Sequence, residues 1–292
     1  MKTFKTQLAF DGKRLILRNF SYIFFSLLMP AGFYLLFTKV MVSGSSTQMK
    51  PFYVSYMDSM IVYSVLISAL FGIAAILKRD RDQGLVTFLS LSAHGTFPYY
   101  LSVAFWMLMM SLFSVAVMGS LAVGINGVSL HFDQWLSLFG VVLIGQLPIM
   151  LIGIGLSYIR RYETLSLASN LITFPMAIVS GLWWPINMLP KWLQSIGELM
   201  PTYFVNQLLN QLTSRAKVDL TNLLGIVAWF VVTGLLVMGS QHFFGQFAKR
   251  LFVKLGHTRK AMLLVQDSLS VLVPLRGCKR SRCKRRLALS DH

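Results

Sequence analysis

Residues 59–77 read SMIVYSVLISALFGIAAIL and carry no charged side chain, whereas residues 78–82 directly after them read KRDRD. The hydrocarbon core of a bilayer is about 30 Å thick, and an α-helix crosses it with roughly 20 apolar residues. A charged side chain at the centre of that core costs from ~2.5 to more than about 10 kcal/mol. This stretch therefore predicts a membrane-spanning helix that ends at a sharp cluster of charges.

The same separation of charged from apolar residues recurs along the chain. Asp, Glu, Lys and Arg are also absent from residues 19–38, 83–132, 134–159, 164–190 and 220–248. The chain is 55% hydrophobic and 13% charged, a composition typical of a polytopic membrane protein. We therefore predict an all-α integral membrane fold with six transmembrane helices. Their approximate positions are 20–38, 59–77, 99–123, 135–158, 164–182 and 222–244.

The placement of Lys and Arg predicts which side of the membrane each connection faces. With six spans, 22 of the 27 basic residues fall on one side and five on the other. Basic residues concentrate in cytoplasmic connections, so we expect both termini in the cytoplasm. We also expect residues 1–250 to form a single transmembrane domain, followed by a disordered basic tail over residues 251–292.

Several function classes are disfavoured. The net charge of +17 would suggest nucleic-acid binding in a soluble protein, but membrane topology explains the basic clusters better, so we expect no nucleic-acid partner. Cys278 and Cys283 match no common zinc spacing, and the chain has no Walker A sequence of its own. Acids near mid-membrane, typical of ion-coupled carriers, are missing from the predicted spans. The acids that lie near or outside span ends include Asp58, Glu163, Glu198 and Asp219.

Two segments on the predicted cytoplasmic side carry further patterns. Residues 1–18 mix apolar and basic residues and predict an interfacial helix on the inner leaflet, although Asp11 falls on the same face as Leu8 and Leu15. After the charges at 78–82, Gly84 predicts a turn into a short surface helix over residues 85–92. The pattern alone favours an ordinary solvated loop there, and a docking helix is the alternative.

The remaining signals lie in and after the fifth span. Small and polar residues from Ser166 to Gly181 share one face of that helix, which predicts a face towards protein or a water path. Helix packing explains such a stripe more often than transport does. After it, Pro185, Pro190 and Pro201 break the chain into short pieces with interfacial tryptophans. We expect short outer re-entrant helices there, which either only anchor the chain or form a gate.

In the outer segment after the fifth span and in the charged loop after the second span, the chain resembles the type-2 ABC exporter permease family. The resemblance covers roughly residues 5–250. The residues that carry the resemblance in the outer segment are Gly181, Pro185, Pro190, Trp192, Leu193, Ile196, Pro201 and Tyr203. Arg81–Gly84 resembles the family's charged R-E-x-G signature, with Asp82 in place of Glu. The chain departs from the family after Ser90, where the usual Thr-Pro is absent, and in its tail beyond residue 250.

The resemblance implies a permease subunit, not itself an enzyme, that exports an amphipathic drug, lipid or peptide. A separate ATPase subunit would bind ATP and Mg, and this chain would bind no cofactor or metal. Two permease copies would pair, as a homodimer or a related heterodimer, in the inner (plasma) membrane of a prokaryote. The alternatives are a stand-alone secondary carrier and a non-transporting membrane sensor or immunity protein.

The resemblance also assigns roles to residues. The segment that couples to the ATPase would include Arg79, Arg81, Asp82, Gly84, Leu85, Phe88 and Leu89. The residues facing the pathway or the dimer axis would be Ser166, Asn170, Thr173, Ala177 and Ser180. The outer gate would comprise Gly181, Trp184, Pro185, Pro190, Trp192, Glu198, Pro201 and Tyr203.

Overall fold

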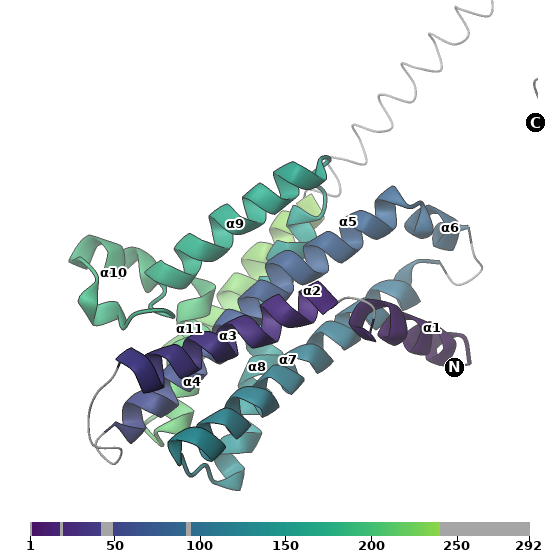
Figure 1. The fold of residues 1–292 in the computed structure, drawn as a ribbon. Helices are drawn as coiled ribbons and strands as arrows, with labels where there is room; N and C mark the ends of the chain where they lie inside the picture. Colours follow the sequence, from purple (N-terminus) through teal and green to yellow (C-terminus); the bar gives the residue numbers. More distant parts are fainter. Residues whose placement is uncertain (1, 18–19, 42–48, 92–94, 240–292) are drawn as a thin grey trace, which may run out of the picture. The chain divides into compact units, whose positions relative to one another are not determined.

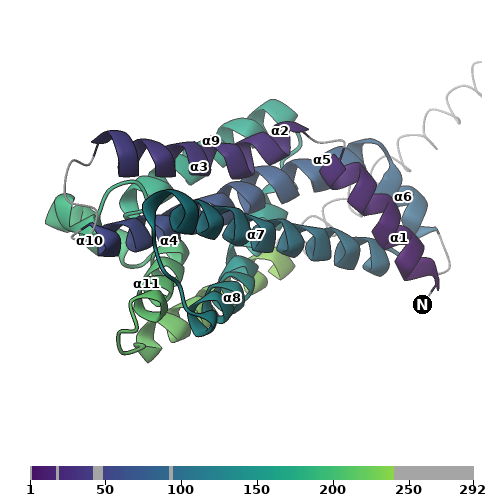
Figure 2. The same cartoon turned by 60° about the horizontal axis from the view of Figure 1, so that its bottom comes forward.

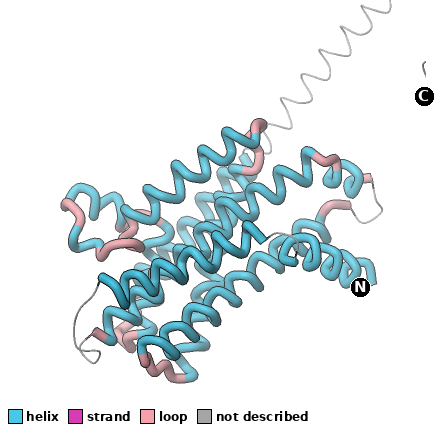
Figure 3. The backbone as a smooth tube through the Cα atoms, viewed as in Figure 1, coloured by secondary structure: helices cyan, strands magenta, loops and turns pink. Residues whose placement is uncertain are grey.

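The computed structural model describes residues 2–17, 20–41, 49–91 and 95–239, and every regular element among them is helical (Figure 3). This confirms the all-α prediction. The chain divides into two compact units, Met1–Met238 and Gly239–His292, and the first unit contains the helical bundle. The predicted tail at 251–292, with Cys278 and Cys283, lies outside the described residues.

The elements follow one another along the chain as labelled in Figure 1. They are α1 (Lys2–Gly12), η1 (Lys13–Leu17), α2 (Phe20–Ile23), η2 (Phe24–Leu28), α3 (Met29–Leu35), η3 (Leu36–Met41), α4 (Lys50–Ile67), η4 (Ser68–Ile73), α5 (Ala74–Asp82), α6 (Leu85–Ser90), α7 (Phe97–Asn126), α8 (Phe132–Leu156), α9 (Tyr162–Val179), η5 (Ile186–Met188), α10 (Lys191–Gly197) and α11 (Pro201–Thr213). η1 to η4 are π-helical and η5 is a 3-10 turn. We call Phe20–Met41 (α2 to η3) the first helix and Lys50–Asp82 (α4, η4, α5) the central helix.

Four helices within the described ranges are long and apolar enough to cross a membrane: Lys50–Asp82, Phe97–Asn126, Phe132–Leu156 and Leu220–Gly239. They match the second, third, fourth and sixth predicted spans. The first helix contains a shorter apolar helical segment, Phe24–Val40. α9 covers the fifth predicted span. It is less apolar than the four helices above and is not one of them, because polar residues such as Asn170 interrupt its apolar sequence.

The central helix is the core of the bundle, since 89% of its most apolar window is buried inside the protein. It is longer at both ends than the predicted span 59–77. Pro51 lies in its first turn, where proline needs no backbone donor. At the other end, Lys78 pairs with Asp82 one turn later at 2.5 Å, so the charged residues remain helical. Figures 1 and 2 show this helix between the first helix, α7 and α9.

Other helices converge on the π-helical turn η4 of the central helix. The hydroxyls of Tyr22, in the first helix, and Ser68 are hydrogen-bonded. From α9, Ser169 donates to the carbonyl of Leu70 at 2.9 Å. From α8, Gly153 lies so close that a Cβ there would overlap the carbonyl oxygen of Ala69. The crossing of these helices is therefore fixed by small residues and hydroxyl groups.

The short helices lie at opposite ends of the bundle (Figures 1 and 2). α1 and α6 lie at the end where α5 finishes, and α10 lies at the end where α9 finishes. α1 packs against the beginning of α7, and α11 packs against α8 and α4. This arrangement places the predicted coupling segment and the predicted outer segment at opposite ends.

Candidate functional site

The N-terminal helix α1 is attached to the bundle by a charge cluster formed by Asp11, Arg14, Asp80 and Tyr99. Arg14 donates to both carboxylate oxygens of Asp80 at 2.8 and 2.7 Å, and the Tyr99 hydroxyl donates to Asp80 at 2.5 Å. Arg14 also donates to Asp11 at 3.3 Å. Burial of the Arg14 guanidinium opposes its charge, but the hydrogen bond and negative charge of Asp80 outweigh this and raise the pKa of Arg14.

This cluster explains the exception in the predicted amphipathic pattern of residues 1–18. Asp11 shares a face with Leu8 and Leu15 because that face packs against protein, where the Asp11 carboxylate is fully buried. Gln7 donates to Asp11 at 2.8 Å, which satisfies a further lone pair. The indole of Trp106, in α7, donates to the carbonyl of Leu8 at 2.8 Å. The predicted helix is therefore present, with this face held by the bundle.

The predicted coupling segment forms the end of α5, a tight turn and α6. Gly84 has a φ of +74°, a left-handed conformation that glycine adopts without a Cβ penalty. Arg81 donates to the carbonyl of Ser157 at 2.9 Å and lies 3.9 Å over the ring of Tyr158. These contacts tie the end of α5 to the connection between α8 and α9. Asp82 is exposed and pairs with Lys78.

α6 has one attached side and one free side. Leu85 and Leu89 pack partly against the core, whereas the side chain of Phe88 is 72% exposed. A pocket of about 510 Å³ separates α6 from α1 and has Arg14, Arg79 and Phe88 among its lining residues. Aromatic residues are enriched at protein–protein interfaces relative to the rest of the protein surface.

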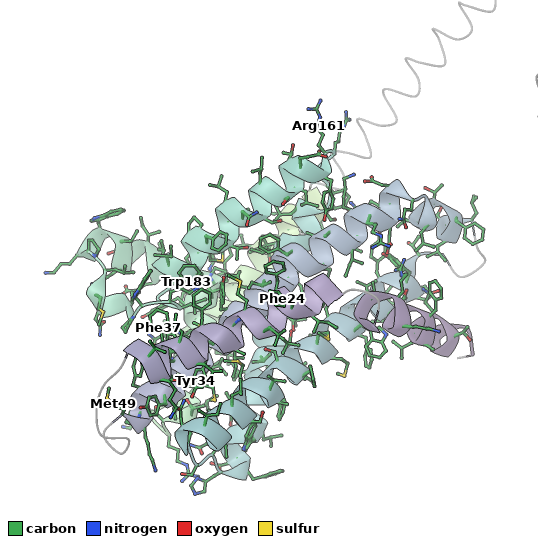
Figure 4. All side chains as sticks on the ribbon, viewed as in Figure 1. Phe24, Tyr34, Phe37, Met49, Arg161 and Trp183 are labelled. Atoms are coloured by element: carbon green, nitrogen blue, oxygen red, sulfur yellow. The ribbon has the colours of Figure 1, made fainter. Side chains whose placement is uncertain are left out.

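A second and more apolar cavity, the long cavity, has a volume of about 460 Å³ and lies between the first helix, the central helix and α9. Figure 4 draws the side chains of these helices and labels Phe24 of the first helix and Trp183, which follows α9. Its walls include six aromatic residues, among them Tyr63 and Phe71, and Arg79 is the charged residue in its lining. Arg79 therefore lines both the long cavity and the pocket beside α6.

The predicted polar stripe of α9 divides between packing and cavity. Ser166, Asn170 and Thr173 line the long cavity, and Asn170 donates to the carbonyl of Ser166 at 2.9 Å. Ala177 is fully buried and lies beyond the cavity. Ser180 forms a 2.5 Å hydrogen bond with Thr202 of α11. The stripe therefore both packs against α11 and lines a cavity.

The predicted outer segment forms short helices at the far end of α9. Gly181 ends α9 with a φ of +76°, Pro185 precedes η5, and Pro190 precedes α10. Pro201 begins α11 and is buried. A third pocket, of about 300 Å³, has Gly181, Trp184, Pro185 and Tyr203 in its lining. Trp192 and Glu198 of the predicted gate are exposed and lie outside that lining.

Two features of this end are missed by sequence reasoning. The first is α11, whose apolar residues at 205, 208, 209 and 212 follow the helical spacing that would have revealed it. The second is Asp58, which the sequence places near the boundary of a predicted span and which lies inside the central helix, because that helix already begins at Lys50. Its carboxylate is fully buried and accepts a 2.6 Å hydrogen bond from Thr213, while its second oxygen has no hydrogen-bond partner among the described residues.

Comparison with known proteins agrees with this architecture. The model of the ABC-2 type transporter family matches residues 8–213. "Putative transport permease YvfS" of Bacillus subtilis (strain 168) is 27% identical over 236 residues, which cover 81% of this chain and 96% of that protein. No solved structure matches. With multiple apolar helices and a family match over most of its length, the chain belongs to the ABC-2 type transporter family, whose multi-pass membrane permeases work with a partner ATPase.

Proposed function

We propose that this chain is the permease subunit of an ATP-binding-cassette exporter that moves an amphipathic substrate outward. ATP and Mg would bind to the separate ATPase, and this chain would bind no cofactor. The single observation that carries the proposal is the position of Arg79, which lines both the long cavity and the pocket beside α6. A displacement of α6 by the ATPase is therefore transmitted directly to a wall of the cavity.

The proposed topology has six spans with both termini in the cytoplasm of a prokaryotic inner membrane. The first helix and α9 complete the set of six. The excess of Lys and Arg beside α1, α5 and the start of α9 supports this orientation. It places α6 in the cytoplasm, where an ATPase can reach it, and η5 and α10 at the outer surface. Residues 1–250 would form the single transmembrane domain, with 251–292 as an appended basic tail.

The proposed coupling surface is the exposed side of α6, with Phe88 as its main anchor. Leu85 and Leu89 fix the helix to the bundle, and the left-handed Gly84 sets its angle relative to α5. Arg81, Asp82 and Arg79 would transmit the displacement along α5. The aromatic ring of Phe88 can fill a pocket in a partner, as buried aromatic anchors do at protein interfaces.

A second copy of the permease would close the open side of the long cavity. The exposed apolar residues Leu167 and Leu171 on α9 and Phe25 and Leu28 on the first helix supply apolar surface around that cavity. The pocket at the outer end, lined by Trp184 and its neighbours, would act as the gate through which substrate leaves. The partner copy is either identical or a related chain.

The proposal is tested by replacing Phe88 with Ala and, separately, Gly84 with Pro, whose fixed φ near −65° cannot satisfy the turn. Phe132→Ala is the matched control, because Phe132 is also a largely exposed phenylalanine, at the start of α8. We expect both coupling variants to insert normally but to lose copurification with the ATPase and ATP-dependent export, while Phe132→Ala retains both. Full export by Gly84→Pro would refute the coupling assignment.

The alternatives give different results in the same assay. A secondary carrier would transport without the ATPase and would stop when the proton gradient collapses. A sensor or immunity protein would bind its ligand without any ATPase-dependent export.

A further inference from the structure

The long cavity is elongated along the bundle. Its lining on the central helix runs from Tyr63 to Arg79, a separation of 16 residues that corresponds to at most about 24 Å at the α-helical rise, because the π-helical turn η4 shortens the stretch slightly. This is most of the roughly 30 Å thickness of a bilayer's hydrocarbon core. A volume of about 460 Å³ spread over that length suits a narrow, chain-like ligand better than a round one.

The charge of the cavity is at one end only. Arg79 makes no hydrogen bond or ion pair through its guanidinium with any described residue, and it is exposed. The acids nearest to it in sequence are engaged elsewhere, because Asp80 binds Arg14 and Asp82 binds Lys78. No Asp or Glu is among the described residues that line the long cavity. The end beside α6 therefore offers an uncompensated positive charge.

A second group in the lining of the long cavity, the hydroxyl of Thr173, lacks a hydrogen-bond partner among the described residues. Thr173 belongs to α9 and is only 1% exposed. Ser169, one turn earlier, is satisfied by the carbonyl of Leu70. An unpaired buried hydroxyl is destabilising, and a hydrogen bond to a ligand's carbonyl or hydroxyl oxygen would remove that penalty.

We propose that the long cavity binds an amphiphile with an anionic headgroup and an extended apolar chain. The anionic group lies against Arg79, the Thr173 hydroxyl donates to a polar atom further along the chain, and the rings of Tyr63, Phe71 and Phe174 contact its apolar part. This assignment rests on the proposed function, since it names the substrate class for the same cavity. It disfavours cationic amphiphiles, for which the described cavity wall holds no counter-charge.

The test is equilibrium binding to the purified full-length protein in a nonionic detergent, without the ATPase. The probes are lysophosphatidylglycerol, which is anionic, lysophosphatidylcholine, which is zwitterionic, and hexadecyltrimethylammonium, which is cationic, all with chains of the same length. We expect the anionic probe to bind at least about tenfold more tightly than the other two. Arg79→Gln should abolish this preference and Thr173→Val should weaken anionic binding several-fold.

Two matched controls separate the cavity from general surface charge. Arg161→Gln removes a positive charge at the same end (Figure 4) from a residue outside the cavity lining, and Thr164→Val removes a hydroxyl from the first turn of α9. Both should bind as the wild type does. Equal binding of anionic and cationic probes, or equal losses in Arg79→Gln and Arg161→Gln, would overturn the proposal. These outcomes are independent of ATPase copurification, so a failure here leaves the proposed function standing.

Discussion

Gly153 of α8 and Gly140 of the same helix should respond in opposite directions to replacement by Ala. A Cβ at Gly153 would overlap the carbonyl oxygen of Ala69 and lie 2.6 Å from Cγ2 of Ile73, whereas a Cβ at Gly140 would have no neighbour within 4 Å. The carbonyl belongs to the backbone of the central helix, so it cannot rotate out of the way. The substitution therefore forces α8 away from η4.

The magnitude is set by two opposing terms. Gly→Ala in a helix interior stabilises by about 0.5–1 kcal/mol through backbone entropy. Overpacking of a well-packed site costs about 1–3 kcal/mol, and a rigid backbone neighbour places Gly153→Ala near the upper value. We expect Gly153→Ala to destabilise by about 2 kcal/mol, whereas Gly140→Ala should stabilise by up to about 1 kcal/mol.

The assay is thermal unfolding of both detergent-purified variants at one fixed scan rate, because unfolding of such proteins is often irreversible. At about 2–4 °C per kcal/mol for a chain of this size, Gly153→Ala should melt about 4–8 °C below the wild type. Gly140→Ala should melt up to about 4 °C above it. A Gly153→Ala protein that melts at or above the wild type would refute the proposed crossing of α8 and the central helix.

Three further predictions concern buried groups. Asp80→Asn should destabilise by about 3 kcal/mol, the lower end for a broken buried ion pair, because it leaves Arg14, whose side chain is 18% exposed, without its carboxylate. Limited proteolysis should then cleave near α1 sooner. Asp58→Asn should keep ATPase-dependent export, since the described contact of Asp58 is the neutral Thr213; loss of export in a folded variant, with dependence on the proton gradient, would instead favour a carrier. Leu209→Ala should lower the melting temperature, because Leu209 is fully buried in α11 and its loss costs about 2–5 kcal/mol.

The long helices were predictable because membrane crossing demands length and excludes charge. α11 was not predicted, since a 13-residue amphipathic helix is too short for a span and follows a proline-rich segment. The start of the central helix was also missed. Its early turns contain Asp58, whose burial depends on α11 packing beside it.

The candidate site was predictable only in outline. Ser169 and Thr173 lie one turn apart on the same face of α9, and both line the cavity. The sequence cannot say that the Ser169 hydroxyl bonds to Leu70 whereas the Thr173 hydroxyl has no partner among the described residues. The position of Asp11 was visible as an irregularity in the amphipathic pattern. Its explanation required Arg14 to reach Asp80, 66 residues further along the chain.

The π-helical turn η4 is a point in the central helix at which α5 could rotate relative to α4. Each backbone donor in a π-helix pairs with an acceptor five residues away instead of four, so such a turn contains more residues than an α-helical one. Converting this turn to ordinary α-helical hydrogen bonding would move each of its donors from one carbonyl to the neighbouring carbonyl. It would also rotate everything after it by about 100°, the angle per residue at 3.6 residues per turn. Ala74–Asp82, which carries Arg79 and Asp80, would then turn about its own axis while Lys50–Ile67 stayed in place.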